Sequence, residues 1–416
     1  MIRAVASDNF PPFGKFVLPL LPVEKKHDEL GEVHLFTGVN GTGKTRLLSI
    51  IAAIAGGHSS LQRRMKGMPH GINIYATDAY PTPYLSGCSL MVVQPPNVVW
   101  TRNVGDFIAQ IQQNPAFAYS ANAYVSDVKV SALANIAPPN RDACLSFSRP
   151  EADSQLLLQA IANLKVASAF PADEFSNAAG KSNPMDLMKV IESTITQITG
   201  VPFQFHLTRF PELSLGVKWG GILLSFDVLP DGLRAIIGWL VHASVMVELW
   251  LQGKSDPRHA EAIFLLDEPE SHLHPAWQRK VLPAFQRLFP KAQIFVATHS
   301  PFVIASINHG WIHPISLGSD GTARFDTAIR AGSGESYVTV VEEIMGLKEW
   351  FDPETEGLLA KFREARKEAY QGNASGQGEV RRLASEIGSR SVELEFMMGR
   401  ELLQMDRQLA KQGSPK

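Results

Sequence analysis

The feature that most limits the possible folds is a glycine-rich loop between two apolar runs. Residues 33–37 form a short apolar run, the loop Gly38-Val-Asn-Gly-Thr-Gly-Lys44-Thr45 follows, and residues 46–55 have helical character. A strand, a glycine loop and a helix in this order are typical of a phosphate-binding loop. Backbone N–H groups and the positive end of the helix hold phosphates in such loops. The segment therefore predicts a nucleotide-binding domain of the α/β class.

Two residues at the end of this loop have separate expected tasks. Lys44 is expected to reach the terminal phosphates, and the hydroxyl of Thr45 is expected to bind Mg²⁺. The alternative is a turn that ends in Lys-Thr by chance, which the correctly ordered strand and helix disfavour. The predicted nucleotide-binding residues of the loop are Gly38, Asn40, Gly41, Thr42, Gly43, Lys44, Thr45 and Arg46.

Two later apolar runs end in polar residues. Residues 262–266 lead into Asp267 and Glu268, and residues 293–298 lead into His299. A predicted helix separates the runs, which favours parallel strands with functional residues at their carboxyl ends. In ATP hydrolysis Asp267 would hold Mg²⁺ through water, and Glu268 would orient the attacking water. His299 would contact the γ-phosphate, so the set predicts an ATPase with catalytic residues Glu268, His299 and Lys44 rather than solvated turns.

These motifs resemble those of ATP-binding-cassette ATPases of the non-transporter kind, an AAA-family group that includes the overcoming-lysogenization-defect, RecF and chromosome-maintenance proteins. The phrase Asp267-Glu-Pro-Glu-Ser-His-Leu-His-Pro275 is similar to the second nucleotide motif and the dimer-facing loop of the first group. Residues 298–301 resemble its histidine switch, and Asn9-Phe10 lies in a hairpin similar to its first strands. The resemblance covers residues 1–55 and 200–310.

The resemblance implies a P-loop fold with a mixed sheet, an antiparallel β subdomain, and a homodimer that sandwiches two ATP molecules with Mg²⁺. It identifies residues 229–234 as the signature loop, in which the backbone of Gly232 would bind the ATP of the second subunit. Pro230 stands where a serine is usual, which removes a hydroxyl contact to the γ-phosphate. Gln94 would be the glutamine-loop residue and a further magnesium ligand.

Three other clusters of residues each allow a functional and a purely structural interpretation. His272 and His274 fall in the dimer-facing loop, and no cysteine or carboxylate cluster accompanies them to suggest zinc. Arg63 and Arg64 are more typical of a solvated helix end than of a phosphate-backbone contact. A third cluster, an apolar stripe on a charged helix, packs either on its own domain or on a partner; its residues are Leu394, Met398, Leu402, Met405 and Leu409.

The chain divides into an ATPase domain, an insertion and a tail. We expect the insertion to be mostly helical and lid-like, with helices at residues 153–169 and 185–199, followed by antiparallel strands over residues 203–226. The expected boundaries are 1–55 and 200–340 for the ATPase domain, 56–199 for the insertion, and 341–416 for a charged helical C-terminal region.

Composition excludes several classes of protein. Lys and Arg number 39 against 41 Asp and Glu, so the formal net charge of −2 excludes nucleic-acid binding by bulk charge but leaves a local site open. Two cysteines cannot build a disulfide scaffold, and no apolar run is long enough for a membrane span. We therefore expect a cytoplasmic protein without a membrane contact.

The remaining choice concerns the function of the ATPase. The segment between the nucleotide motifs is too long for a transporter subunit and too short for a chromosome-type coiled coil, and residues 302–416 lack the Asp-x-Asp of a fused nuclease. The chain thus resembles the ATPase subunits of bacterial antiphage systems such as Septu, retron-linked pairs and PARIS. We expect ATP-bound dimers or higher assemblies to regulate a separate nuclease or toxin effector. The alternative is a RecF-like or chromosome-maintenance-like DNA-repair ATPase that acts directly on DNA.

Overall fold

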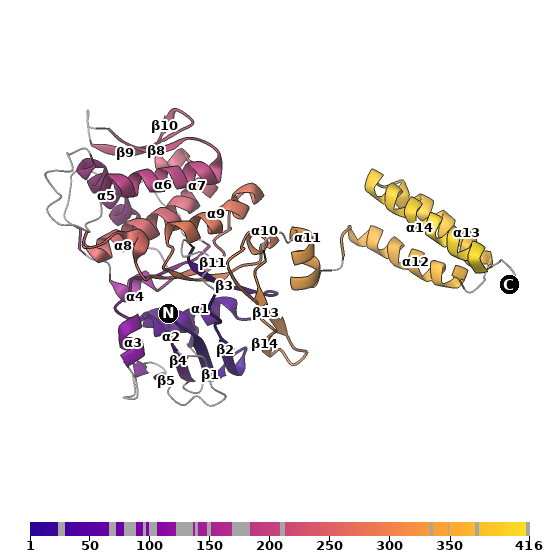
Figure 1. The fold of residues 1–416 in the computed structure, drawn as a ribbon, viewed down its shortest axis with the longest axis horizontal. Helices are drawn as coiled ribbons and strands as arrows, with labels where there is room; N and C mark the ends of the chain where they lie inside the picture. The colour runs from indigo at the N-terminus through magenta and orange to yellow at the C-terminus, as the bar shows by residue number, and fades with distance from the viewer. Residues whose placement is uncertain are drawn as a thin grey trace. The chain divides into compact units, whose positions relative to one another are not determined.

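The protein folds into two compact units, Met1–Val340 and Val341–Lys416, which are described separately (Figure 1). The structure is a computed structural model. It describes residues 1–23, 30–65, 72–78, 89–94, 97–99, 106–121, 136–137, 140–147, 151–168, 184–208, 213–332, 336–347, 349–370 and 374–412.

A mixed sheet of seven strands runs through the first unit. Five of its strands are mutually parallel, and the antiparallel strands β14 and β15 pair with one of them, β13. The strand order is β14 (Ala323–Phe325), β13 (Gly310–Leu317), β3 (Glu32–Thr37), β12 (Gln293–Ala297), β11 (Ile263–Asp267) and β7 (Ala116–Tyr119), with β15 (Ile329–Arg330) also beside β13. β3 and β12 are buried along their whole length, as expected for parallel strands covered on both faces. The predicted α/β class with a mixed sheet is confirmed.

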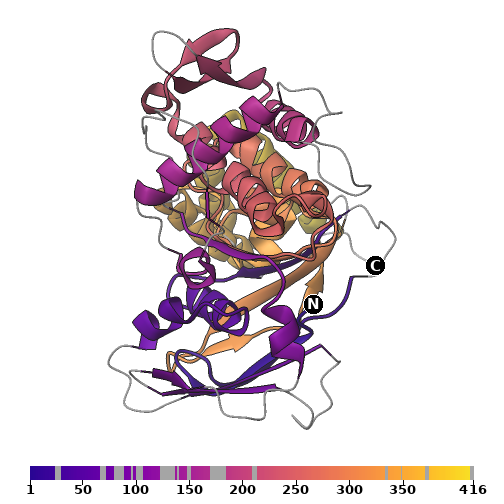
Figure 2. The same cartoon turned by 90° about the vertical axis from the view of Figure 1, so that its left-hand side faces the viewer.

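A second, antiparallel sheet lies on the other side of the helix that follows the glycine loop (Figure 2). Its order is β2 (Gly14–Pro19), β1 (Ala4–Phe10), β4 (Ile72–Thr77), β5 (Ser89–Gln94) and β6 (Asn97–Val99). The predicted N-terminal hairpin and antiparallel β subdomain are therefore present. A third sheet, β8 (Phe203–Thr208), β9 (Ser214–Trp219) and β10 (Ile222–Leu224), matches the strands predicted over residues 203–226.

The segment expected as a lid-like insertion differs from that expectation in one respect. Its helices α5 (Glu151–Ala167) and α6 (Pro184–Thr199) lie where the apolar spacing predicts them. However, β4, β5 and β6 belong to the antiparallel sheet, and β7 is an outer strand of the main sheet. β4 pairs with β1 and β7 pairs with β11, both distant in the sequence, whereas β5 and β6 extend the antiparallel sheet from β4. Residues 56–199 thus supply strands to both sheets as well as helices. The sequence did not predict these strands because they are short and leave little local pattern.

Helices cover both faces of the main sheet. α1 (Lys44–Ile54) is almost wholly buried, and its apolar side chains share one core with Leu265 of β11 and with the antiparallel sheet. α9 (Pro275–Leu288) covers the opposite face, where Phe285 packs edge-on against Phe264 at 4.9 Å between ring centroids. Successive residues of a strand point to opposite faces, so Phe264 and Leu265 join β11 to both layers.

One continuous helical run is long and apolar enough to cross a membrane, judged by length and composition alone. It extends over Asp231–Leu251 and includes α7 (Asp231–Ile236), a π-helical turn (Ile237–Val241) and α8 (His242–Leu251). Within its most apolar window, 83% of the residues are buried inside the unit. A helix that is apolar on all sides is expected at the centre of a large protein, and this helix has that position.

In the described part of the second unit, the helices α12, α13 and α14 lie side by side (Figure 1). They are α12 (Pro353–Tyr370), α13 (Ala374–Gly388) and α14 (Val392–Gln412). The apolar stripe predicted on α14 faces Phe362 of α12 and Leu383 of α13. Leu394, Met398 and Met405 are buried, and the other two stripe residues pack against the same cluster. The interpretation that this stripe packs on its own domain is confirmed.

A buried polar chain crosses the main sheet of the first unit. Glu32 Oε1 accepts hydrogen bonds from Arg3 Nη1 (2.6 Å), His34 Nε2 (2.9 Å) and Gln293 Nε2 (3.0 Å). Because His34 donates through Nε2, its Nδ1 is the acceptor for Nε2–H of His313 at 3.1 Å. Burial alone would raise the pKa of Glu32, but the hydrogen bonds from His34 and Arg3 hold it at about 2. Burial lowers the pKa of both histidines, so the network contains two neutral imidazoles.

This network predicts a loss of stability under mildly acidic conditions. Above pH 6.5 the histidines are neutral in both the folded and unfolded states. Below it the unfolded chain binds protons that His34 and His313 reject in the folded state, so the free energy of unfolding falls by up to about 1.4 kcal/mol per pH unit for each. Urea titrations at pH 8 and pH 5.5 measure this loss. His313→Phe should reduce the difference between the two pH values, and an unchanged difference would exclude His313 as a source.

Candidate nucleotide site

The loop before α1 has a backbone that only glycine accommodates at two positions. Gly38 has φ 153°, and a Cβ added there would lie 2.2 Å from the carbonyl oxygen of Ile315. Gly43 has φ 88°, and its Cβ would lie 2.7 Å from Pro12 in the turn of the N-terminal hairpin. Gly43 caps α1 without a side-chain hydrogen bond, so the first N–H groups of the helix keep their capacity to bind an anion.

Lys44 is held inside the loop by the backbone. Its Nζ donates hydrogen bonds to the carbonyl oxygens of Gly38 (2.8 Å) and Val39 (3.2 Å). Burial lowers the pKa of Lys44 to about 8, although Glu268 and Asp267 act in the opposite direction. The ammonium group thus faces neutral carbonyls in a poorly solvated place. An anion that entered the loop would stabilise its charge.

Thr45 and Asp267 meet across 222 positions of sequence. Thr45 Oγ1 donates a hydrogen bond of 2.9 Å to Asp267 Oδ1. Burial raises the pKa of Asp267 to about 6, and the neighbouring Glu268 adds to the effect, while the Thr45 hydrogen bond opposes it. A hydroxyl and a carboxylate oxygen are ligands that Mg²⁺ accepts in nucleotide sites. These residues fit a magnesium site, since a cation there would offset the burial of the carboxylate.

For Gln94, the third expected magnesium ligand, the structure describes only the backbone position. It is the last residue of β5 and pairs in register with Asn97 of β6. Its side chain lies outside the described residues.

Glu268 begins the turn after β11 in an unusual conformation. Its φ is 52°, in the left-handed region that costs non-glycine residues energy. The conformation is fixed by a hydrogen bond of 2.8 Å from Glu268 N–H to the carbonyl of Ala297 on the next strand. Its side chain is 45% exposed, and Oε1 lies 3.9 Å from His299 Nε2. Burial and the charge of Lys44 lower the pKa of His299, so this imidazole is neutral at pH 7. The three residues predicted to be catalytic, Lys44, Glu268 and His299, therefore lie in one small region.

Sequence reasoning assigned no role to Glu270, which ties two loops of the site together. Its Oε1 accepts hydrogen bonds from the Thr298 hydroxyl and from His299 N–H, the latter at 3.2 Å. Its Oε2 is buried and has no hydrogen-bond partner among the described residues. Burial raises the pKa of this carboxyl. Its position two residues after Glu268 could have indicated a role in the site. Its hydrogen-bond partners follow the adjacent parallel strand, so the sequence alone did not reveal them.

Arg63 and Arg64, which the sequence indicated as a solvated helix end, lie in α2 (His58–Met65) and have different surroundings. Arg63 donates to the carbonyl of Ser146. Arg64 is partly buried, which lowers its pKa, while the nearby charge of Asp267 raises it. Arg64 therefore contributes positive potential near the site, which the sequence alone did not indicate. Arg46 is tied to the N-terminal hairpin through a hydrogen bond of 3.0 Å from Nη1 to the carbonyl of Pro11.

The signature loop and the dimer-facing loop contact each other within one chain. Gly232 is buried, and a Cβ there would lie 2.8 Å from the carbonyl oxygen of His272. Pro230 is exposed and caps α7 without a side-chain hydrogen bond. His274 caps α9, since its Nδ1 accepts a hydrogen bond of 3.2 Å from Ala276 N–H. Within the signature loop, Pro230 and Asp231 are exposed, whereas Leu229 and Gly232 are buried.

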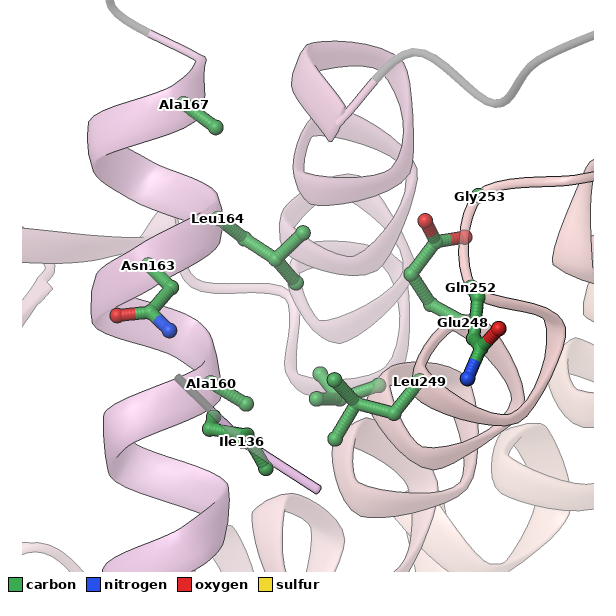
Figure 3. A pocket seen from close by; sticks show the side chains of 10 residues that line it. Ile136, Ala160, Asn163, Leu164, Ala167, Glu248, Leu249, Gln252 and Gly253 are labelled. Atoms are coloured by element: carbon green, nitrogen blue, oxygen red, sulfur yellow. The ribbon is translucent and has the colours of Figure 1, made fainter. Parts of the chain in front are cut away.

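A separate hollow of about 400 Å³ lies between α5 and α8 (Figure 3). Leu164 and Leu249 point toward each other across it, and Glu248 and Gln252 stand at one side. None of its lining residues belongs to the nucleotide motifs, and we assign it no role.

Comparisons with known proteins agree with this geometry. Residues 218–305 match the family model described as "AAA domain, putative AbiEii toxin, Type IV TA system". The chain is 28% identical over 119 residues to "Retron Vc95 probable ATPase" of Vibrio cholerae and 29% identical over 147 residues to "Septu protein PtuA" of Bacillus thuringiensis. These alignments take in 29% and 34% of this chain, but only 23% and 37% of the two relatives. Residues 218–305 therefore match an AAA-type ATPase domain, and the aligned segments of the chain are similar to retron and Septu proteins.

Solved structures show a weaker likeness. A Pyrococcus furiosus Smc head domain bound to the C-terminal domain of ScpA has a TM-score of 0.45 at 15% identity, covering 83% of this chain and 99% of that one. RecF with ATP has a TM-score of 0.41 at 12% identity, covering 78% and 99%. Scores of this size assign neither a function nor a partner.

The left-handed backbone at Glu268 predicts a stabilising substitution. Glu268→Gly should raise the free energy of unfolding by about 1 kcal/mol relative to Glu268→Ala, because both remove the carboxylate and only glycine relieves the backbone. Guanidinium titrations of the two variants give this difference. If the glycine variant were no more stable than the alanine variant, the backbone at this position would not be strained.

Proposed function

We propose that this chain is an ABC-type ATPase whose nucleotide-driven dimerisation regulates a separate effector, in antiphage defence. The observation that carries the proposal is the meeting of Lys44, Thr45, Asp267, Glu268 and His299 at one edge of the main sheet. Phosphate-binding, magnesium-binding and water-orienting groups are what phosphoryl transfer to water requires.

The residues of this chain would divide the work of hydrolysis as follows. The N–H groups of the loop and of the first turn of α1 bind phosphate oxygens, and Lys44 contacts the terminal phosphates. Thr45 and Asp267, with Gln94, would hold Mg²⁺, which neutralises charge on the phosphates when bound. Glu268 accepts a hydrogen bond from the attacking water and aligns it with the γ-phosphorus. Neutral His299 donates a hydrogen bond to a γ-phosphate oxygen.

The second half of each site would come from another copy of the chain. Residues 230 and 231 are exposed at the start of α7, where the positive end of a long helix favours a phosphate. Pro230 offers no hydroxyl and Gly232 is buried, so the contact across the dimer relies on the helix terminus and Asp231 N–H. We expect the dimer to form with ATP and to open after hydrolysis.

The effector and the antiphage setting are supported by the named relatives. The aligned parts of this chain are similar to proteins named as a retron ATPase and a Septu protein. Copurification of the native chain with its neighbouring gene products, and phage challenge of cells with and without them, test this part. Recovery of the chain alone without phage protection would contradict it, and ATP-dependent binding of DNA ends or gaps by the pure chain would favour the RecF-like alternative.

Two substitutions separate ATP binding from hydrolysis. Glu268→Gln should keep ATP binding, lower turnover by roughly 10²–10⁴-fold and trap the dimer, because an amide cannot accept the proton of the attacking water. Lys44→Ala should lose ATP binding. Equilibrium binding, phosphate release and native mass with ATP measure these effects. Exposed Glu261→Gln and Lys291→Ala are matched controls, and undiminished hydrolysis by Glu268→Gln would refute its role.

The raised pKa of Asp267 predicts a pH-dependent need for magnesium. Protonation of this carboxyl below about pH 6 competes with Mg²⁺, so more Mg²⁺ should be needed for ATP binding at pH 5.5 than at pH 7.5. Calorimetric titration of ATP at several Mg²⁺ concentrations measures the shift. In Asp267→Asn the pH dependence should shrink, and an equal shift in this variant would assign the titration to another group.

A further inference from the structure

The outer face of α14 carries large apolar side chains exposed to solvent. Val392, Phe396 and Leu403 are 69%, 73% and 62% exposed. Phe396 and Leu403 lie two helical turns apart and project from the side opposite the buried residues Leu394 and Met405. A shallow groove of about 630 Å³ borders the two exposed residues. Because the inner stripe of α14 is already covered within the unit, this outer stripe is a separate surface of a kind that marks binding sites.

Charges on this helix fall into two groups. Glu401 pairs with Arg366 of α12, and Asp406 pairs with Arg381 of α13, so these charges are used inside the unit. On the outer face, Glu393 near the start of α14 and Arg407 near its end lie on the rim of the groove. Among the described residues, neither has a recorded ion pair. Exposed Arg400 lies between them on the same groove, so the outer face is acidic at its start and basic from its middle to its end.

We propose that this face pairs with the same face of a second copy of the chain, with the two α14 helices antiparallel and crossing near residues 399–400. Glu393 and Arg407 lie seven residues, or ~10 Å, on either side of Arg400. An antiparallel pair therefore places Glu393 beside Arg407 of the partner subunit, twice by symmetry. It also places Phe396 against Leu403 of the partner subunit. A parallel pair would bring like charges together at residues 393, 400 and 407, whereas an antiparallel pair brings together only the two Arg400 side chains, so charge favours the antiparallel orientation.

The crossing point has the side chains that such a pair needs. Gly399 is exposed, and an added Cβ there would meet nothing within 4 Å, so packing inside the unit does not require glycine. Glycine in a helix interior costs about 1 kcal/mol relative to alanine. At the crossing it gives Arg400 of the partner subunit room to lie across the helix. The opposed helix dipoles also favour the antiparallel arrangement.

This contact goes beyond the proposed function because it requires no nucleotide. Three exposed apolar residues per copy make a small interface, which is typical of weak association. Weak contacts gain strength when the same molecules are also joined elsewhere, because the second contact becomes intramolecular. The outer face of α14 is thus suited to join ATP-dependent dimers into larger assemblies.

Sedimentation of the full chain without nucleotide and with EDTA tests the contact. We expect a monomer–dimer equilibrium over about 1–100 μM, in the range of a weak interface. Phe396→Glu with Leu403→Glu should shift the chain to monomer, at least tenfold in dissociation constant. The control is Ile222→Glu with Leu223→Glu, a pair of similarly exposed residues on β10 that should leave the equilibrium unchanged. A chain that stays monomeric at all concentrations overturns the proposal.

A charge exchange provides a test that misfolding cannot imitate. Glu393→Arg should weaken the dimer by placing two cations together at each end, and Glu393→Arg with Arg407→Glu should restore it. Failure of the double variant to restore association contradicts the antiparallel arrangement. Because no nucleotide is present, neither outcome depends on whether the chain is an ATPase.

Cysteine cross-linking reports the orientation directly. Only positions at the crossing of an antiparallel pair lie next to themselves, so Arg400→Cys should form a disulfide between copies and Leu403→Cys should form much less. The unaltered chain is the control for disulfides formed by the native residues Cys88 and Cys144. Equal cross-linking at both positions indicates a parallel pair and overturns the proposed geometry. If the thiol introduced at position 400 were protected from thiol reagents in the monomer, another part of the same chain would cover this face. That result would overturn the proposal as well.

Discussion

The parallel alignment of β3, β12 and β11 is the constraint on which the site depends. All three strands run in one direction, so their carboxyl ends share an edge, and the residues that follow each strand meet there. The glycine loop follows β3, the Asp267–Glu270 segment follows β11, and the Thr298–His299 segment follows β12. Register matters as much as direction, because a slip of one residue would turn each strand's side chains to the opposite layer. The aromatic contact of Phe264 with α9 and the packing of Leu265 in the core beside α1 oppose such a slip.

Burial explains the electrostatics of the site more than any single ion pair does. It lowers the pKa of Lys44, and it raises the pKa of Asp267 and Glu270, so each group is held where its charge is poorly solvated. Such groups are stabilised by a ligand of opposite charge, and a phosphate bound with a divalent cation supplies both signs at once. The hydrogen bonds of Lys44 to backbone carbonyls and of Thr45 to Asp267 keep the groups from pairing with each other instead.

Sequence identified the parts of the fold whose signals are local. The glycine loop, the apolar runs ending in Asp267 and His299, and helices α5 and α6 could be predicted because spacing and residue type within about 20 positions determine them. The strands β4 and β7 could not, since their partners β1 and β11 lie far along the chain and leave no local period. Glu270 and Arg64 escaped for the same reason: their roles depend on Thr298 and Asp267, which only the folded sheet brings near. Gly232 lies in the loop that the sequence predicts to be the signature loop, but its burial against His272 depends on packing between two loops.

The two proposed contacts between copies have a joint geometrical consequence. Each is isologous, because the same surface of both subunits takes part, and each therefore generates a two-fold axis. One isologous contact alone stops at a dimer. Two different ones on each subunit continue from copy to copy, and they give a closed ring of dimers where the axes intersect suitably, or an open chain where they do not. The contact at the nucleotide site would depend on ATP, whereas that of α14 would not. Hydrolysis would then divide an assembly at every second contact into pairs joined through α14, so that ATP would control assembly size without altering the tail.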